Sequence, residues 1–275
     1  MTTTSVERPR TTTRTRPASV VRKTWMVRAW QVGLVILWLA AWELTVRSGV
    51  LAPVLAKSPL DSWNYLVEAM ISGELMTNLG ATMTAVIIAW VLAGVLGVCA
   101  GIAVGLMPTV ERVISPFMDA VNAMPRIALA PLFIVVFGIT TTAKVAVAAT
   151  LVFFIVFSGS RAGVRSTDAE LLRLSTVLGA KPHQIFAKVL FPVAVPAIFA
   201  SLRLGLVYSL LGVVGSELIS ARDGLGQLVA MYSATFRMEA VYAILIVLAI
   251  VATVLNLIMG LIERRLLTWQ PPTDR

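Results

Sequence analysis

Cysteine, histidine and charge are all scarce in this chain. Of its 275 residues one is cysteine (Cys99), one is histidine (His183), and 13% are charged. A single cysteine excludes an intrachain disulfide and a cysteine-based zinc cluster, and a single histidine argues against a histidine metal site. A soluble domain carries about 25% charged residues. With 58% hydrophobic residues, the composition instead predicts an all-α integral membrane protein.

Catalytic motifs are also missing from the sequence. It contains no G-x-x-x-x-G-K-[ST] phosphate loop, no H-E-x-x-H and no G-x-S-x-G, which excludes ATP hydrolysis through a phosphate loop and disfavours zinc-protease or serine-hydrolase chemistry. We therefore predict that the chain is not an enzyme, with no catalytic residues, no metal and no cofactor of its own.

Acidic residues are few at the start of the chain, where most of the net charge of +9 lies. Residues 1–28 hold seven basic residues and one acid in a Thr/Arg/Pro-rich context. This composition predicts a disordered basic tail. We interpret it as a cytoplasmic anchor that follows the positive-inside rule, and not as a nucleic-acid-binding arm. It lacks the small-residue cleavage site of a secretory signal, so residues 29–50 read as an uncleaved first span.

Long apolar runs predict six transmembrane helices within a membrane domain at 29–265, followed by a cytoplasmic tail at 266–275. Six spans place both termini on one side, and 16 of the 23 basic residues then fall in inner segments. This asymmetry predicts that both termini are cytoplasmic. The predicted spans are 29–50, 79–106, 114–138, 143–162, 196–216 and 240–262.

The third predicted span is irregular. Pro116, Pro125 and Pro131 interrupt it, and Asn122 and Arg126 lie within it. Broken, polar helices in membranes usually line a cavity or a translocation path. The alternative is that 113–124 forms only an interfacial elbow and that the span starts near Arg126, whose side chain would lie at headgroup level. The predicted path residues are Asn122, Arg126, Ser209 and Glu217.

Three further segments invite interpretation. Gly97, Gly101 and Gly105 form a stripe that lets another helix approach closely, either in the same chain or across a dimer. Residues 61–72 have the pattern of an amphipathic surface helix. Residues 217–238 are too polar to span the membrane and too apolar for a free loop, which favours a re-entrant or gate-like outer segment.

A polar interlude at 167–196 separates two apolar runs. Thr167 and Glu170 have the spacing of a capping box, Gly179 stands where a helix would stop, and Pro182 can open a second helix that Pro192 ends. Each helix would be about half of the ~20 residues needed to span a bilayer. The pattern predicts a compact helix pair on the cytoplasmic surface, suited to contact with a partner.

This interlude resembles the cytoplasmic EAA loop of ABC importer permeases. Gly179-Ala180 and Val189-Leu190-Phe191-Pro192 stand at the family's spacing, whereas the EAA triplet reads Arg173-Leu174-Ser175 and lacks the signature acid. The chain is similar to the nitrate/sulfonate/taurine branch over about residues 30–265. That likeness rests on Trp42-Glu43, Ser58-Pro59, Gly73-Glu74-Leu75, Met124-Pro125, Ala130-Pro131-Leu132, Phe137-Gly138, Glu217-Leu218-Ile219 and Gly224-Leu225-Gly226.

The resemblance implies a bacterial inner-membrane permease with the five-helix type I importer core plus an N-terminal helix. It also implies a second permease copy, two cytoplasmic ATPase subunits that bind ATP and Mg, and an extracytoplasmic binding protein that delivers a sulfonate, taurine, nitrate or aromatic carboxylate-like anion. The coupling loop would be 167–192. The implied ATPase contacts are Arg173, Leu174, Ser175, Gly179, Ala180, Ile185, Phe186, Val189 and Pro192.

A stand-alone secondary transporter or channel is the alternative function. It predicts inverted repeats and ionisable residues near the membrane midplane. No internal repeat is visible in the sequence. Transport that depends on a proton gradient and survives loss of any ATPase would favour this alternative.

Overall fold

The computed structural model describes residues 18–49 and 55–267. The chain divides into two compact units, Met1–Pro59 and Leu60–Arg275. In the first unit, helix α1 (Ala18–Arg47) begins eleven residues before the predicted span. The segment 18–28 is therefore helical and not disordered, since it contains no proline or glycine to interrupt a helix. The rest of the predicted N-terminal tail, and positions 268–275 of the C-terminal one, lie outside the described residues.

The end of α1 carries an i,i+4 ion pair. Arg47 Nε lies 2.6 Å from Glu43 Oε1 in the last turn, where a basic residue also complements the helix dipole. Trp42 Nε1 donates a hydrogen bond to the Lys57 carbonyl at 3.1 Å. The Trp42–Lys57 hydrogen bond joins α1 to a residue that follows it in the chain.

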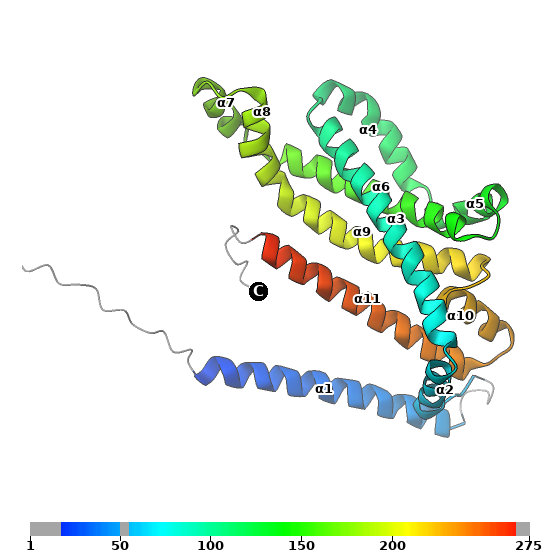
Figure 1. The fold of residues 1–275 in the computed structure, drawn as a ribbon. Helices are drawn as coiled ribbons and strands as arrows, with labels where there is room; N and C mark the ends of the chain where they lie inside the picture. Colours follow the sequence, from blue (N-terminus) through cyan, green and yellow to red (C-terminus); the bar gives the residue numbers. More distant parts are fainter. Residues whose placement is uncertain (1–17, 50–54, 268–275) are drawn as a thin grey trace, which may run out of the picture. The chain divides into compact units, whose positions relative to one another are not determined.

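The second unit contains the remaining elements, drawn in Figure 1. They are α2 (Pro59–Ile71), α3 (Glu74–Gly105), α4 (Pro108–Ala123), 3-10 helix η1 (Arg126–Leu129), α5 (Ala130–Phe137), α6 (Thr141–Arg165), α7 (Ala169–Val177), α8 (Pro182–Ile185), π-helical turn η2 (Phe186–Leu190), α9 (Phe191–Ile219), α10 (Leu225–Ala234) and α11 (Met238–Leu266). Within the described residues, five helices are long and apolar enough to cross a membrane: α1 from Ala29, α3, α6, Pro182–Ile219 and α11. The bent pair of α4 and η1–α5 gives a sixth candidate.

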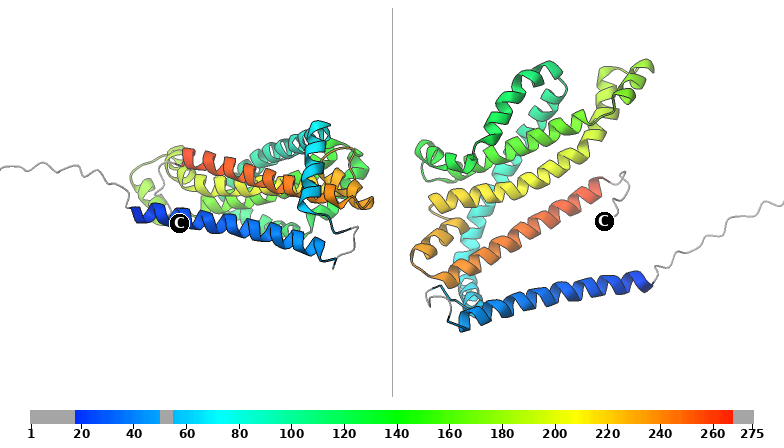
Figure 2. Two further views of the ribbon diagram at one scale, coloured as in Figure 1. Left: turned by 90° about the horizontal axis from the view of Figure 1, so that it is seen from below. Right: turned by 180° about the vertical axis from the view of Figure 1, so that it is seen from behind.

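Close packing of α6 between α3 and α9 forms the centre of this unit (Figure 2). The glycine stripe of α3 faces α6: a Cβ on Gly101 would lie 2.5 Å from the Phe157 carbonyl oxygen, and one on Gly97 would lie 2.9 Å from that of Phe153. The intrachain alternative for this stripe is therefore the one that the structure supports. On the other side, a Cβ on Gly163 would lie 2.9 Å from the Ala194 carbonyl of α9.

The predicted span at 114–138 is two helices and not one. The axes of α4 and the following η1–α5 differ by 82°, and the break falls at Met124–Pro125, where both residues leave helical geometry. Pro116 lies inside α4 and Pro131 lies in the first turn of α5, where a missing N–H is tolerated. Because η1 and α5 together rise only about 20 Å, they are too short to cross the ~30 Å core of a bilayer by themselves, and the start of the third span stays a prediction.

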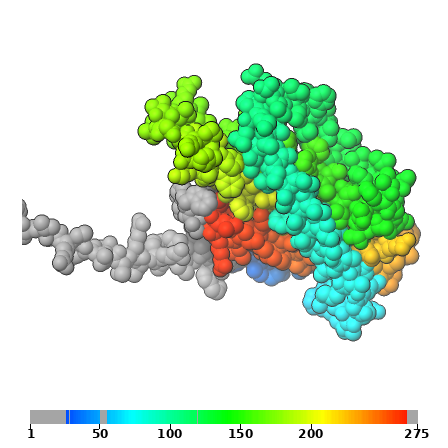
Figure 3. Space-filling view, turned by 45° about the horizontal axis from the view of Figure 1, so that its top comes forward, coloured from blue at the N-terminus to red at the C-terminus, as the bar shows by residue number. Residues whose placement is uncertain are grey.

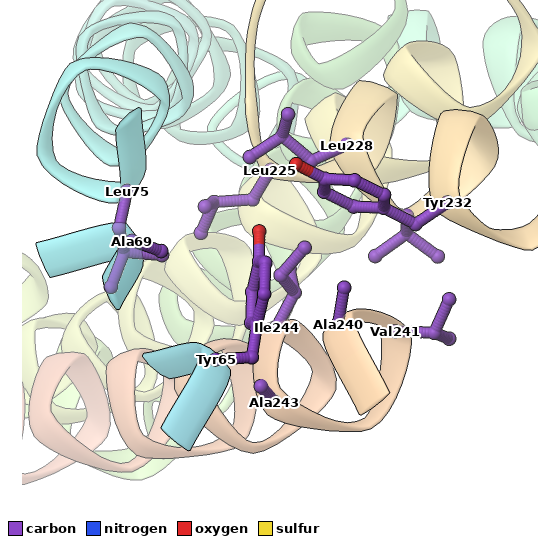
Figure 4. Close-up of a cluster of buried hydrophobic side chains, with 11 residues drawn as sticks. Tyr65, Ala69, Leu75, Leu225, Leu228, Tyr232, Ala240, Val241, Ala243 and Ile244 are labelled. Atoms are coloured by element: carbon purple, nitrogen blue, oxygen red, sulfur yellow. The ribbon is translucent and has the colours of Figure 1, made fainter. Parts of the chain in front are cut away.

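At the end of the unit that carries α10, the helices α2, α3, α10 and α11 enclose one buried apolar cluster (Figure 4). Helix α2 contributes Tyr65 and Ala69 to it. The amphipathic surface helix predicted at 61–72 is thus present as α2. Of the apolar side chains on the predicted face, Leu66 packs against the cluster, whereas Trp63, Val67, Met70 and Ile71 are exposed.

Candidate functional site

In the coupling segment, which we define as residues 167–192, the first helix begins one residue later than predicted. Asp168 and not Thr167 caps α7: its Oδ1 accepts a hydrogen bond from the Glu170 N–H at 2.8 Å. Aspartate is as good a cap as threonine or better, and its negative charge suits a helix N-terminus. Helix α7 then extends to Val177.

Gly179 ends α7 as predicted, with φ of +78°. Its N–H donates to the Thr176 carbonyl at 3.0 Å, and the Ala180 N–H donates to the Ser175 carbonyl at 3.1 Å. These two bonds form a Schellman motif, which satisfies the last carbonyls of the helix. A left-handed residue is required here, and glycine adopts this conformation without a Cβ penalty.

The second half of the segment is continuous with a membrane span. Pro182 opens α8 as predicted, and the Gln184 side chain accepts the Lys181 N–H at 2.8 Å. The expectation that Pro192 ends this helix is wrong, because Pro192 lies in the first turn of α9. The π turn η2 bridges the two helices, with the Phe191 N–H bonded to the Phe186 carbonyl. Such a widened turn relieves the clash of a proline ring with the carbonyl four residues before it.

Apolar side chains of the coupling segment face outward. None of the residues from Ala169 to Leu190 is buried, and Leu174, Val177 and Leu178 are 55%, 84% and 76% exposed. The segment projects from the body of the unit in Figure 3. The predicted contact residues are distributed along it: Arg173, Leu174 and Ser175 on α7, Gly179 and Ala180 in the turn, Ile185 at the end of α8, Phe186 and Val189 in η2, and Pro192 in α9.

A charged cluster ties the base of this segment to the start of α4. Glu111 is only 7% exposed and its Oε1 lies 2.5 Å from Arg165 and 3.8 Å from Arg161, both on the last turns of α6. The Arg161 guanidinium also lies over the Phe157 ring at 5.7 Å. No local pattern predicts this pairing, because Glu111 and Arg165 are 54 residues apart.

Two of the predicted path residues lie together at the bend between α4 and α5. Arg126 donates to the Asn122 side chain, and its guanidinium lies 4.4 Å from the Phe154 ring centroid of α6. Arg126 is 9% exposed, whereas Asn122 is exposed. Among the described residues the Arg126 Nε has no hydrogen-bond partner. A buried guanidinium with a spare donor is chemically suited to an anion.

The other two predicted path residues are buried between helices. Ser209 donates to the Val86 carbonyl of α3 at 2.8 Å and is fully buried. Glu217 is 1% exposed and accepts bonds from Thr82 and Lys144. The structure therefore does not bring these two residues together with Asn122 and Arg126, and a role for them along the path stays a prediction.

Sequence reasoning missed the partners of the charged residues within the spans. Lys144 is 3% exposed and faces Glu217. The Arg203 Nε donates to Asn256 at 2.7 Å, and its Nη1 lies 3.3 Å from Glu263. A lone charge in an apolar run is the available signal, since it requires a partner in the fold.

A family model for the inner membrane component of binding-protein-dependent transport systems matches residues 93–268. The chain belongs to this family. As a member of it, the chain is a multi-pass inner-membrane permease of the ABC importer class, and its relatives are permeases and not enzymes.

Three curated relatives of this permease carry different substrate names. The riboflavin transport system permease protein RibX of Chloroflexus aurantiacus is 33% identical and the match covers 93% of this chain and 95% of RibX. The taurine transport system permease protein TauC of Escherichia coli is 30% identical over 86% and 88% of the two chains. The formylaminopyrimidine transport permease protein ThiX of Halalkalibacterium halodurans is 27% identical over 83% and 91%.

Solved ABC transporters share the fold of this permease. A chain of the inward-facing MetNI methionine ABC transporter matches with a TM-score of 0.61 and 19% identity, covering 72% of this chain and 98% of that one. A chain of an amino acid ABC transporter with histidines matches with a TM-score of 0.53 and 21% identity, covering 73% and 97%. The all-helical importer-permease architecture expected from the sequence is thus confirmed.

Proposed function

We propose that this permease pairs with a second copy and couples two cytoplasmic ATPase subunits to the import of a small organic or inorganic anion. An extracytoplasmic binding protein would deliver the anion, and the ATPase subunits would bind ATP and Mg. Both termini and the coupling segment would lie in the cytoplasm. The observation that carries the proposal is the exposed apolar surface of the coupling segment, which joins α6 directly to α9.

The coupling segment has the properties of a helix that seats in a partner's groove. Its exposed leucine and valine side chains on α7 form a contiguous apolar surface, a feature that marks binding sites in proteins. Because the segment is attached at both ends to spanning helices, a push on it would move α6 and α9 as rigid bodies. The chain lacks a phosphate loop, so an external source of ATP hydrolysis fits this design.

Gly179 offers a sharp test of this role. A Cβ there would meet no atom of this chain within 4 Å, so within the permease Gly179→Val would act through the backbone, since a left-handed conformation costs an L-residue about 1–2 kcal/mol. We expect Gly179→Val to abolish uptake and ATPase co-purification while membrane insertion is unchanged. Gly179→Asn is the matched control, because asparagine tolerates this conformation, and it should retain both activities.

Normal uptake and normal ATPase co-purification in Gly179→Val would contradict the coupling role. Uptake that continues without any ATPase and collapses with the proton gradient would instead support a stand-alone transporter.

The proposed substrate class rests on the path residues and not on the coupling segment. Arg126 is a buried positive charge beside the exposed Asn122, and a charge partly shielded from water favours an anion by Coulomb attraction. Sulfonates, taurine, nitrate and aromatic carboxylates are the candidates. Mass spectrometry of the ligand that co-purifies with the binding protein encoded beside this gene would identify it, and a cationic ligand would contradict the proposal.

A further inference from the structure

A buried carboxylate sits near the end of α9 that leads to α10. Glu217 is 1% exposed and receives hydrogen bonds from three different elements. Thr82 Oγ1 of α3 lies 3.0 Å from both carboxylate oxygens, Lys144 Nζ of α6 lies 3.2 Å from Oε1, and the Gly226 N–H of α10 lies 2.9 Å from Oε2. One side chain thus connects the ends of three spans to a non-spanning helix.

The same helices also hold the backbone that enters α10. Lys144 Nζ donates to the Asp223 carbonyl oxygen at 2.6 Å and to its Oδ1 at 2.5 Å. Asn78 Oδ1 accepts the Gly224 N–H at 2.8 Å, and Thr82 Oγ1 accepts the Leu225 N–H at 2.9 Å. The first turn of α10 would otherwise leave N–H groups unsatisfied.

Two glycines make this close approach possible. Gly224 has φ of +111°, and a Cβ on it would collide with the Glu217 carboxylate. A Cβ on Gly226 would lie 2.6 Å from the Val214 carbonyl oxygen and 2.7 Å from the Glu217 Cβ. The entry to α10 is therefore fitted to this one carboxylate, with no room for a side chain on either residue.

The charged side chains of this cluster differ in how deeply they are buried. Lys144 and Glu217 are both buried, with side chains 4% and 0% exposed, whereas the Asp223 side chain is 52% exposed. Removing one member of a buried pair leaves the other charge uncompensated. An exposed carboxylate can be lost at little cost because solvent already screens it.

We propose that Lys144 and Glu217 are positioning residues that latch α10 closed over the outer ends of α3, α6 and α9. In this arrangement α10 covers the apolar cluster that contains Leu228, Leu225 and Tyr65. The placement of α10 at the extracytoplasmic end rests on the proposed function. The latch itself rests on the contacts alone, so it can be tested without knowing the substrate.

The single native cysteine makes a labelling experiment practical. In a Cys99→Ser background, Leu228→Cys places a thiol under α10 at a position that is 4% exposed. We expect Lys144→Met to raise its maleimide labelling rate in purified protein by about tenfold or more, because labelling follows local opening. Asp223→Asn should leave the rate near the parent value, and the double variant Lys144→Met/Glu217→Gln should restore protection, since neither buried charge remains.

Val147→Cys, a fully buried position one turn further along α6 from Lys144, reports general loosening. An unchanged Leu228→Cys rate in Lys144→Met, a Val147→Cys rate that rises in step with it, or a double variant as reactive as the single one would each overturn the latch. If labelling behaves as expected while uptake proves independent of any ATPase, the proposed function fails and the latch stands.

Discussion

Two tyrosines meet one carboxylate in the cluster beneath α10. The rings of Tyr65 and Tyr232 lie edge to face with centroids 5.5 Å apart, and the Tyr232 hydroxyl donates to Glu74 Oε1 at 2.9 Å. The Arg237 guanidinium lies 5.0 Å from the Tyr232 ring. Burial raises the pKa of both phenols, and Glu74 adds to the increase in each because its negative charge opposes a phenolate. Each phenol is thus held in its neutral form.

The raised tyrosine pKa values predict loss of stability in alkali. Above about pH 10 the unfolded chain releases its phenolic protons while the folded chain retains them, so the free energy of unfolding falls as pH rises. The contribution is fully present below that pH. We expect the thermal midpoint of the purified protein to decline between about pH 9 and pH 12, and Tyr65→Phe to flatten that decline.

Tyr208→Phe, which changes a half-exposed tyrosine of α9 outside this cluster, is the control for the alkaline experiment. An equally steep decline in Tyr65→Phe and in the parent would contradict the assignment.

At the scale of elements, the contact between α3 and α6 depends on the missing side chain of Gly101. The helix backbones approach so closely that a Cβ there would lie 2.5 Å from the Phe157 carbonyl oxygen and 2.8 Å from the Ser160 Cβ. Both obstacles belong to or adjoin the backbone of α6, so they cannot move without shifting the helix. In membranes such small-residue contacts supply the dispersion attraction that holds helices together.

Gly101→Ala should therefore destabilise the fold by about 1–3 kcal/mol, the usual cost of overpacking. Gly80→Ala is the matched control in the same helix, because a Cβ at Gly80 meets nothing within 4 Å and alanine favours a helix. Unfolding in mixed micelles, followed by tryptophan fluorescence, measures both. Equal stability of the two variants would refute this account of the packing.

The elements show where sequence reasoning succeeds and where it stops. Hydropathy found the long helices, and Gly179 and Pro182 marked the turn of the coupling segment, because glycine and proline restrict the backbone locally. The cap at Asp168, the continuation through Pro192 and the partners of the buried charges were missed. Each of these depends on competition between adjacent candidates or on tertiary contacts, which a local pattern does not contain.

The candidate site divides in the same way. The coupling segment is local in sequence. Its pair of helices, each too short to span a membrane, could therefore be predicted from the pattern and length of the segment. The pairs Lys144–Glu217 and Glu111–Arg165 join residues 73 and 54 positions apart. Only the packing of α6 against its neighbours brings them together.

At the scale of the whole second unit, the coupling segment and α10, which carry the two proposals, lie at opposite ends of α9. The coupling segment precedes α9 and α10 follows it, and α9 would be about 43 Å long at the usual rise per residue. Figure 1 shows the two segments at the two ends of this helix. With the coupling segment in the cytoplasm, as proposed, α10 would lie on the outer side of the membrane.

This arrangement predicts opposite labelling for two exposed arginine positions in a Cys99→Ser background. Arg222→Cys, next to α10, should react with an impermeant maleimide in cells whose inner membrane is sealed but whose outer layers have been removed. Arg173→Cys, on α7, should react only after the membrane is permeabilised. The reverse pattern would invert the proposed orientation, and labelling of both in intact cells would contradict the topology.

Because α8, η2 and α9 are continuous, a small tilt at η2 would produce a larger displacement at the far end of α9. Residues Pro182–Ile219 form one rod of 38 residues, with a π turn near the end that carries the coupling segment. A tilt of about 1° at that turn would displace the far end of α9 by roughly 0.8 Å, given a rise of 1.5 Å per residue. Such a displacement is comparable with the margin by which hydrogen bonds are made or lost. Glu217 lies in the last turn of α9, so this displacement would move its carboxylate.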